Sequence, residues 1–441
     1  MTAGREAWAV VDLGFGDAGK GTIVDFLARE RGASLVVRFN GGAQAGHSVV
    51  TGDGRHHTFS QLGAASFVPG VGTHLGPAFV FHPGALLVEA RHLAAQQVPE
   101  PLARLTVDAR ARVITPFQQA AGRLRELARG SAAHGTCGVG VGEAVADALD
   151  GRDDVLTAAD LRDLRGARAR LVAQQERKRD ELAEAQGLED PRAVAEWAVL
   201  DDPALADRVL AAWAPLADVR ILDPSAAERR IHAADRILFE GAQGVLLDET
   251  WGFHPHTTWS DCTFAGAEAL LAGDDRPLRR LGVLRAYATR HGSGPFPTAS
   301  PEFDRALPEP RLDPKSWQGA FRTGPLDTVL LRYALAVCGG VDGLALTCLD
   351  RIASWPVVPL CHTYETDHHG PVSNLDPGPA ADLSHRERLG RWLGQVRPVI
   401  DNVAPSDLAR EVERCLGAPV WIVGEGPAAG DKRWGSVLPP G

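Results

Sequence analysis

The chain has 441 residues and a mass of 46.9 kDa, enough for two or three domains or for one large α/β domain with insertions. Hydrophobic residues make up 44% and charged residues 23% of the sequence, which excludes a wholly disordered chain. The net charge of -10 and the pI of about 5.8 disfavour a nucleic-acid-binding protein, because such proteins usually present a basic face.

The compartment is predicted from what the sequence lacks. No apolar run reaches the roughly 18 residues that a membrane-spanning helix needs, so we expect no membrane partner. The first eight residues show neither the basic nor the apolar region of a signal peptide. The cysteines form no C-x-x-C pair and are too sparse for a disulfide scaffold: Cys137, Cys262, Cys338, Cys348, Cys361 and Cys415. A cytoplasmic protein with reduced thiols is expected.

In chain order, the first elements predict a βαβ unit. Residues 8–13 are an apolar strand, residues 14–21 a glycine-rich loop, residues 22–31 a helix and residues 34–39 a second strand. Further strands are predicted at 78–81, 237–240, 282–287, 343–348 and 420–423. The fold class is therefore α/β, with a P-loop-like, mostly parallel central sheet flanked by helices.

The segment 157–220 differs from the rest of the chain. Its leucines, valines and a tryptophan are spread among arginines and carboxylates, a pattern that favours a helical insertion packed on the core. We therefore expect one large α/β domain over residues 1–441 that contains this insertion.

The strongest local motif is the loop Gly14–Thr22, G-F-G-D-A-G-K-G-T, between a strand and a helix. Its backbone N–H groups and the helix N-terminus suit phosphate, and Lys20 can reach the terminal phosphates. Glycine stands where a Ser or Thr usually follows the lysine. A carboxylate beside phosphates is unfavourable, so Asp17 makes sense only as a base or a cation ligand.

Three further loops follow predicted strands. They are Arg38–His47 (R-F-N-G-G-A-Q-A-G-H), Phe239–Asp248 (F-E-G-A-Q-G-V-L-L-D) and Thr289–Thr298 (T-R-H-G-S-G-P-F-P-T). The first belongs at the same carboxyl edge of the sheet as the phosphate loop, and this is the edge where ligands bind in open α/β sheets. Taken alone, the other two are better explained as ordinary strand-to-loop turns than as sites.

Together these motifs resemble those of the adenylosuccinate synthetase family. The family's G-D-E-G-K-G-K loop is similar to residues 16–22, and its G-G-x-N-A-G-H loop to residues 41–47. F-E-G-A-Q-G-x-L-L-D, T-R-x-G-x-G-P-F-P-T and R-T-G-x-L-D-T are matched at 239–248, 289–298 and 322–328. L-T-K-L-D becomes Leu346–Asp350, and a final T-G-P resembles Glu425–Pro427. The resemblance runs from Val10 to about Pro427.

The resemblance implies a GTP-dependent ligase that joins L-aspartate to C6 of IMP through a 6-phosphoryl intermediate. Asp17 would take the N1 proton of the 6-oxopurine while the GTP γ-phosphoryl group passes to O6, and His47 would act as an acid. The implied catalytic residues are Asp17, His47, Lys20 and Gln243. The carboxylate of Asp350 would select guanine, which offers two N–H donors, over adenine.

The resemblance also implies binding residues. GTP would be bound by Gly16, Gly19, Lys20, Gly21, Asp350, Gly424 and Gly426. IMP would be bound by Gln44, Ala45, Gly46, Thr136, Cys137, Gln243 and Thr258. Aspartate would be bound by Arg322, Arg290 and Thr298. Mg²⁺ would be bound by Asp17 and the carbonyl group of Gly46. A homodimer is implied as well.

Three departures from the family pattern matter. The arginine-rich loop T-T-G-R-R-R-R, which clamps aspartate, aligns with residues 316–322 and keeps only Arg322. Cys137 replaces a phosphate-facing threonine. The arginine that a partner subunit contributes has no clean counterpart, and Arg152 is the nearest candidate. Phage relatives that use dGMP tend to lose the catalytic aspartate, whereas Asp17 is present here.

Two alternatives stay open. One is a specialised ligase that acts on a modified purine or C-nucleoside monophosphate in nucleoside-antibiotic synthesis. The other is a non-catalytic P-loop GTP-binding protein, which Asp17, His47 and Gln243 disfavour because a sensor needs no acid and base beside O6.

Overall fold

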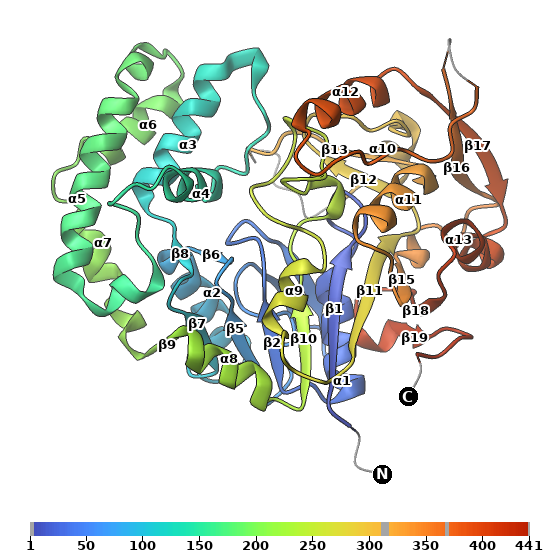
Figure 1. Cartoon of the computed structure of the whole chain (residues 1–441), viewed down its shortest axis with the longest axis horizontal. Helices are drawn as coiled ribbons and strands as arrows, with labels where there is room; N and C mark the ends of the chain where they lie inside the picture. The colour runs from blue at the N-terminus through green and yellow to red at the C-terminus, as the bar shows by residue number, and fades with distance from the viewer. Residues whose placement is uncertain (1–3, 310–316, 367–369, 440–441) are drawn as a thin grey trace.

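A ten-stranded sheet forms the centre of the protein in the computed structural model, which describes residues 4–309, 317–366 and 370–439 (Figure 1). Neighbouring strands are parallel except for the antiparallel pair β18–β19 at one edge. The order across the sheet is β19 (Lys432–Trp434), β18 (Val420–Gly424), β15 (Gly343–Thr347), β11 (Leu278–Arg285), β1 (Glu6–Asp12), β10 (Arg236–Glu240), β2 (Leu35–Arg38), β5 (Gly72–Leu75), β7 (Leu105–Asp108) and β9 (Arg220–Leu222).

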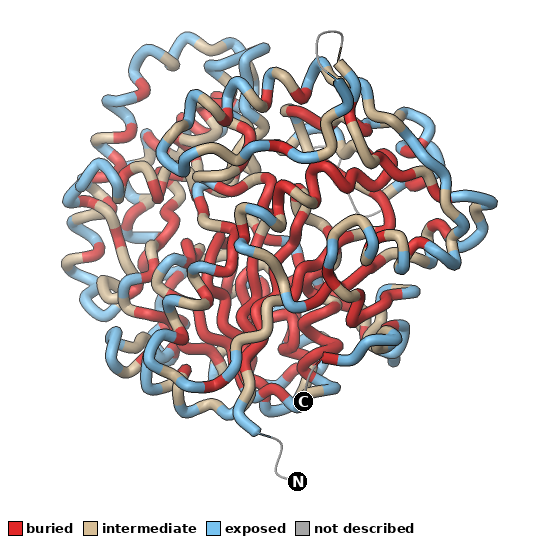
Figure 2. Tube along the Cα trace, turned by 45° about the vertical axis from the view of Figure 1, so that its right-hand side comes forward, coloured by how far each residue is buried: buried red, intermediate tan, exposed pale blue. Residues whose placement is uncertain are grey.

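Strand β1 lies inside this sheet because nearly all of its residues can be buried. Trp8 and Val10 belong to the core on one face, while Ala7, Ala9 and Val11 belong to the core on the other, as the alternation of side chains along a strand requires. Buried residues concentrate along the sheet strands (Figure 2). The four loops singled out by sequence therefore start from a rigid scaffold.

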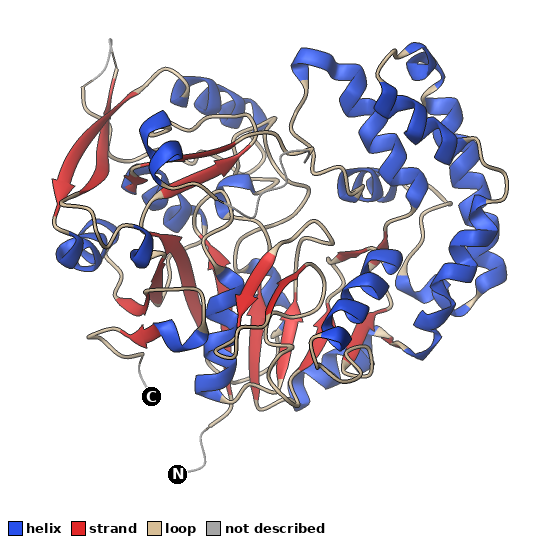
Figure 3. Cartoon of the chain, turned by 180° about the vertical axis from the view of Figure 1, so that it is seen from behind, coloured by secondary structure: helices blue, strands red, loops and turns tan. Residues whose placement is uncertain are grey.

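Helices cover both faces of the sheet (Figure 3). They are α1 (Lys20–Arg31), α2 (Pro83–Ala95), α8 (Pro224–Ala233), α9 (Ala265–Leu270), α11 (Thr328–Val337) and α13 (Leu408–Leu416). Two further helices, α10 (Pro301–Ala306) and α12 (Leu383–Leu393), lie beyond the carboxyl ends of the sheet strands, at the top of Figure 1. Helix α1 ends at Gly32, whose φ of 63° is the left-handed conformation that glycine adopts without strain. Among the described residues no helix is both long and apolar enough to cross a bilayer.

A separate helical lobe lies beyond the β9 edge of the sheet (Figure 1). It contains α3 (Pro116–Arg129), α4 (Val141–Leu149), α5 (Leu164–Glu181), α6 (Pro191–Leu200) and α7 (Leu205–Trp213). The segment 157–220 thus supplies α5 to α7, whereas α3 and α4 precede it. Whether the chain is one domain with this insertion stays a prediction.

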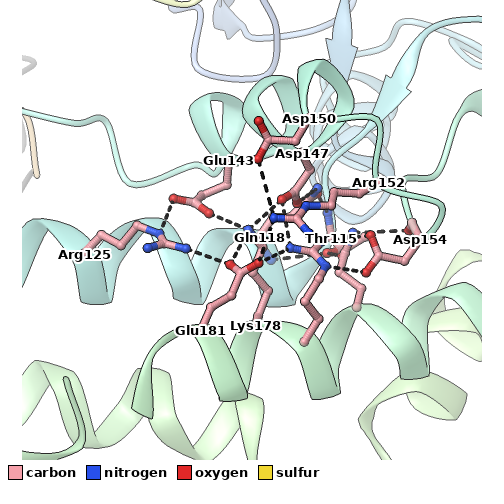
Figure 4. A network of polar contacts seen from close by, with 12 residues as sticks. Thr115, Gln118, Arg125, Glu143, Asp147, Asp150, Arg152, Asp154, Lys178 and Glu181 are labelled. Carbon is pink, nitrogen blue, oxygen red and sulfur yellow. Dashed lines mark hydrogen bonds and ion pairs between the residues drawn. The ribbon is translucent and has the colours of Figure 1, made fainter. Parts of the chain in front are cut away.

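Charged side chains connect three helices of the lobe (Figure 4). Arg125 of α3 contacts Glu143 of α4 at 3.0 Å and Glu181 of α5 at 2.8 Å. Lys178 of α5, whose side chain is only 2% exposed, contacts Glu143 at 2.7 Å and Asp147 at 2.8 Å. Because the charges of Lys178 and Asp147 are buried, each depends on its partners.

The smaller sheets surround the carboxyl edge of the central sheet. They are β3 (His47–Val50) with β4 (His56–Phe59), β12 (Ala288–His291) with β13 (Phe321–Gly324), β6 (Val80–Phe81) with β8 (Arg112–Val113), and β14 (Leu326–Asp327) with β16 (Val358–Glu365) and β17 (Arg397–Val403).

The predicted fold class is confirmed, with local corrections. The strand predicted at 78–81 is only β6, and it lies outside the central sheet. The sequence analysis does not predict strands β5, β7, β9 and β19 of the central sheet. Strands β5 and β7 carry polar residues, such as His74 and Thr106, that are buried in the structure.

Candidate active site

The loops that follow β1, β2 and β10 meet at the carboxyl edge of the sheet. The loop after β10 packs directly against the loop after β1, because a Cβ added at Gly244 would lie only 2.2 Å from the carbonyl oxygen of Gly14. A Cβ added at Gly21 would lie 2.7 Å from the Cβ of His47. The predicted catalytic residues Asp17, Lys20, His47 and Gln243 therefore belong to one constellation, although their roles stay predictions.

The carboxylate of Asp12, at the end of β1, holds the backbone of the phosphate loop in place. It accepts hydrogen bonds from the backbone N–H groups of Gly14 and Ala18, both at 2.8 Å, and pairs with Nζ of Lys20 at 3.1 Å. The same ammonium group donates to the carbonyl oxygen of Gln243 at 2.6 Å. Sequence reasoning missed Asp12, although an acidic residue closing an apolar strand was a visible signal.

The start of α1 is suited to an anion. Its N-cap residue is Gly19, no side chain caps the first turn, and no acidic residue lies there. Its first backbone N–H groups thus remain free to bind phosphate. Gly16 and Gly19 have φ angles of 92° and 87°, which lets the loop fold closely without strain.

Asp17 itself has a φ of 63°, which is uncommon for a non-glycine residue. Its Oδ2 lies 3.1 Å from Nε2 of His291, and its carbonyl oxygen accepts a hydrogen bond from Nε of Arg285 at 2.5 Å. Burial acts to raise the pKa of Asp17, but the hydrogen bond and charge of His291, together with Arg285 and Lys20, lower it to about 2. The carboxylate is thus ionised at neutral pH.

His47 lies at the start of β3, buried against Glu240. Its Nδ1 is 2.5 Å from Oε1 of Glu240, whose Oε2 accepts the backbone N–H of Ala64 at 3.0 Å. Burial, then the nearby charge of Arg38, lowers the pKa of His47 to about 4, although Glu240 opposes this. The neutral ring donates from Nδ1 to Glu240, which leaves Nε2 as an acceptor. Sequence reasoning had not assigned Glu240 a role.

Two carboxamides beside the Gly41–Gly42 turn lack partners. The Oε1 atoms of Gln44 and Gln243 are buried and accept no hydrogen bond in the described structure. A Cβ at Gly42 would lie 3.0 Å from the first, and a Cβ at Gly41 would lie 2.8 Å from the second. Buried polar atoms are normally paired, so these two indicate a ligand with N–H or O–H donors. Ala45 and Gly46 continue the same turn.

The loop that contains Thr136 and Cys137 extends from the helical lobe toward the loop between β12 and β13. Glu126 accepts hydrogen bonds from the backbone N–H groups of Gly135, at 2.6 Å, and Thr136, at 3.2 Å. A Cβ at Gly138 would lie 2.6 Å from Trp317. On the other side, Thr258 donates its backbone N–H to Leu247 at 2.7 Å. Burial raises the pKa of the Cys137 thiol, which is therefore protonated at neutral pH.

The residues predicted to bind the substrate aspartate lie on β12, on β13 and in the loop between these strands. Arg322 donates to the carbonyl oxygens of Gly292 and Gly294, but its Nε has no partner; the buried Oγ1 of Thr298 also has none. Arg290 differs, since its guanidinium donates to the carbonyls of Ser293, Pro295 and His256 and lies 4.1 Å from the Phe15 ring. Arg290 thus supports the loop, and an aspartate contact would require it to give up one of these bonds.

The predicted guanine end lies where β15 and β18 end. Asp350 is exposed, and the preceding Cys348 has a φ of 60°. Thr22 of α1 donates to the carbonyl oxygen of Pro427 at 2.8 Å. Nζ of Lys432 holds the carbonyl oxygens of Gly426 at 2.6 Å and Ala428 at 2.8 Å. The loop after Gly424 is thereby fastened beside the phosphate loop.

Ser316 and Arg152 are the remaining positions at which this chain departs from the family pattern. Ser316 lies outside the described residues. Arg152, the candidate for the cross-subunit arginine, has a half-exposed side chain 3.7 Å from Asp150 and 3.9 Å from Glu181 of its own chain (Figure 4). These long, exposed contacts are weak, so they would not prevent Arg152 from reaching a partner.

Sequence comparison identifies relatives over almost the full length. The sequence model of the adenylosuccinate synthetase family matches residues 9–431. The adenylosuccinate synthetase of Myxococcus xanthus is 34% identical, with 96% of this chain and 97% of the relative covered. That of Neisseria meningitidis is 33% identical, with 95% and 96% covered.

Two solved structures share the fold. The fully ligated adenylosuccinate synthetase of Plasmodium falciparum has a TM-score of 0.79 at 21% identity, with 97% of this chain and 99% of that chain covered. The succinoaminodeoxyadenylate synthetase of cyanophage S-2L, bound to dGMP and dATP, has a TM-score of 0.61 at 19% identity, with 98% and 96% covered.

Proposed function

Because this chain belongs to the adenylosuccinate synthetase family of GTP-dependent carbon–nitrogen ligases, we propose that its own residues Asp17 and His47 activate O6 of IMP for attack by L-aspartate. The products are adenylosuccinate, GDP and phosphate. The observation that carries the proposal is Asp17, an ionised carboxylate inside a loop otherwise built for phosphate.

The first step makes O6 a leaving group. Asp17 accepts the proton from N1, the electrons of the N1–H bond move toward O6, and O6 attacks the γ-phosphorus of GTP as the bond to GDP breaks. Lys20 and the N–H groups at the start of α1 then balance the charge on the phosphates. For this, Nζ of Lys20 exchanges at least one of its bonds to Asp12 and Gln243 for phosphate oxygen.

In the second step the amine nitrogen of aspartate forms a bond to C6, the C6–O6 bond breaks as phosphate leaves with O6, and the proton that the amine loses passes to the departing phosphate. His47 acts in the first step, where its Nε2 can face the transferring phosphoryl group while Nδ1 is fixed on Glu240. The pKa of His47 is about 4 without nucleotide, and a dianionic phosphoryl group beside Nε2 would raise it. His47 then holds a proton on Nε2 and donates a hydrogen bond to the transferring group.

Unpaired polar atoms support the assignment of the nucleotide and aspartate subsites. The buried carboxamides of Gln44 and Gln243 suit the edge of a 6-oxopurine, with Thr136, Cys137 and Thr258 around it. Arg322 Nε and Thr298 Oγ1 suit a carboxylate of aspartate. Asp350 accepts the two N–H donors of guanine and thereby favours GTP over ATP.

Magnesium fits the residues present. The Asp17 carboxylate is partly exposed and the carbonyl of Gly46 belongs to the adjoining loop, and such hard oxygen ligands are those that Mg²⁺ prefers. When bound, the ion would neutralise charge on the phosphates. We also propose a cytoplasmic homodimer, with Arg152 as the residue offered to the partner subunit.

A nucleotide panel tests this function. Purified protein is given GTP, Mg²⁺ and L-aspartate with IMP, dIMP, GMP, dGMP or a modified purine monophosphate, and phosphate release and product mass are measured. Adenylosuccinate formed with IMP supports the proposal. Product from a modified purine alone would favour the specialised ligase, and GTP hydrolysis without any nucleotide dependence would favour a GTP-binding protein without ligase activity.

A further inference from the structure

Three potential metal ligands meet on the outer side of the molecule, at β16 and α13. Glu411 and Cys415 are four residues apart on α13, so they lie on one face of the helix. His362 belongs to β16. All three side chains are partly buried, and their ligand atoms lie within 4.8 Å of one another. None of them belongs to the candidate active site described above.

The spacing of the three groups matches a metal site. Cys415 Sγ lies 3.3 Å from Nδ1 of His362 and 3.4 Å from Oε1 of Glu411, and Nε2 of His362 lies 3.6 Å from that oxygen. Ligands around a tetrahedral zinc ion, with bonds of about 2.0–2.3 Å, are separated by roughly 3.3–3.7 Å. A modest rotation of the imidazole would present one of its nitrogens to an ion between the sulfur and the carboxylate.

The backbone under these ligands is held in place by Arg332 of α11. Its guanidinium donates to the carbonyl oxygen of His362 at 2.7 Å and to that of Cys415 at 3.5 Å. It also donates to the carbonyl oxygen of Ser373 at 2.9 Å. One side chain therefore fixes the strand and the helix that carry the ligands. This arrangement lowers the ordering cost of ion binding.

We propose that His362, Glu411 and Cys415 form a binding site for a zinc-class divalent transition-metal ion, with water as the fourth ligand. A thiolate, an imidazole and a carboxylate together suit Zn²⁺ or Co²⁺, whereas Mg²⁺ prefers oxygen alone. The site is therefore chemically distinct from the Mg²⁺ position at Asp17.

Two local features set its affinity. Burial, then the Glu411 carboxylate, raises the pKa of Cys415 to about 11, so the ion must displace a thiol proton. The protonated thiol also disfavours a nucleophilic role for Cys415. The exposed Arg414 donates to both oxygens of Glu411, at 2.5 and 2.9 Å, and competes with a cation there.

The test is a Co²⁺ titration of the reduced, full-length protein in the presence of a non-thiol reductant. We expect one equivalent to give the near-ultraviolet absorption of a cobalt–thiolate bond and the intense visible bands of tetrahedral cobalt, both abolished by Zn²⁺ but not by excess Mg²⁺. Cys415→Ser should remove the thiolate absorption, and His362→Gln should weaken Co²⁺ binding at least about 10-fold. Arg414→Gln should tighten binding by freeing Glu411.

The matched control is Cys338→Ala, which removes a different buried thiol and should leave the titration unchanged. Circular dichroism of each variant verifies folding, and Arg414→Gln tests the site without removing a ligand. Absence of thiolate absorption in the unaltered protein would overturn the proposal. An absorption that survives in Cys415→Ser, or that disappears equally in Cys338→Ala, would overturn it as well.

Discussion

Asp17 in the phosphate loop and His291 at the end of β12 are hydrogen-bonded side chain to side chain, with Oδ2 and Nε2 3.1 Å apart. The Nδ1 atom of His291 is buried and has no partner in the described structure, while its ring packs edge-on against Phe321 at 4.8 Å. The pair connects the predicted base directly to the β12–β13 hairpin that carries Arg322. If Asp17 and Arg322 act as proposed, this contact would link the chemistry at N1 of the purine to the aspartate subsite.

Replacing Asp17 with Asn removes the base but keeps the shape of the loop. We expect kcat to fall by about 10²–10⁴-fold, the usual loss for a positioned base, with GTP affinity largely retained. Steady-state kinetics and a GTP-binding titration measure the two quantities. Near-normal turnover would show that Asp17 is not the base.

His291 should determine the pH at which activity is lost on the acid side of the pH profile. Asp17 has a pKa of about 2, because His291 and the nearby cations outweigh burial. In His291→Val burial remains while the hydrogen bond and charge are lost, so the pKa of Asp17 rises. Since the base must be ionised, the acid limb of the kcat/KM profile should move to higher pH. His92→Gln, at an exposed histidine, is the control. An acid limb that does not move in His291→Val would show that His291 does not control the ionisation of the base.

Asp350 should decide between GTP and ATP. Asp350→Asn loses one charged acceptor for the guanine N–H groups, which costs about 1.5–3 kcal/mol of discrimination. The ratio of kcat/KM for GTP to that for ATP should fall accordingly. Equal use of both nucleotides by the unaltered enzyme would contradict the assignment.

Arg322 should affect the binding of aspartate and not that of GTP. Lysine cannot form the planar fork of a guanidinium, so Arg322→Lys should raise the KM for aspartate far more than the KM for GTP. Its Nε is unpaired in the structure, whereas the guanidinium of Arg290 donates to backbone carbonyls through all three nitrogens. Arg290→Lys should therefore lower the free energy of unfolding, because lysine cannot replace these three hydrogen bonds. An aspartate KM that does not change in Arg322→Lys would overturn the assignment.

Lys178 should stabilise the helical lobe. Lys178→Met leaves the buried carboxylate of Asp147 and the partly buried carboxylate of Glu143 with fewer cations, and we expect the free energy of unfolding to fall by about 3 kcal/mol. Arg168→Ala on the same helix is the matched control, because its pair with Asp207 is exposed to solvent and should contribute far less to the free energy of unfolding. Urea unfolding followed by circular dichroism measures both, and equal losses would refute the role of burial.

The sequence predicts the inner strands and the loops at their ends because those strands are continuous apolar runs and the loops carry glycine at conformations that require it. It does not predict β5 or β7, since His74 and Thr106 are buried as a hydrogen-bonded pair at 3.0 Å across the two strands. Pairing between distant segments leaves no periodic signal within either one.

The same limit applies to the site. Asp17, Lys20 and Gln243 stand in recognisable loops, whereas the contacts of Glu240 with His47 and of His291 with Asp17 join residues 193 and 274 positions apart. Arg290 shows the reverse: its motif suggests a ligand-binding arginine, but the carbonyls that hold it become visible only when the loop is folded.

The central claim is that O6 of the purine leaves as part of phosphate, and an isotope experiment tests it most directly. IMP labelled with ¹⁸O at O6 is incubated with GTP, Mg²⁺ and L-aspartate, and the inorganic phosphate and the purine product are analysed by mass spectrometry. The account predicts one ¹⁸O atom in each phosphate released and none at C6 of an adenylosuccinate product. Unlabelled phosphate released while the purine keeps its ¹⁸O would contradict it.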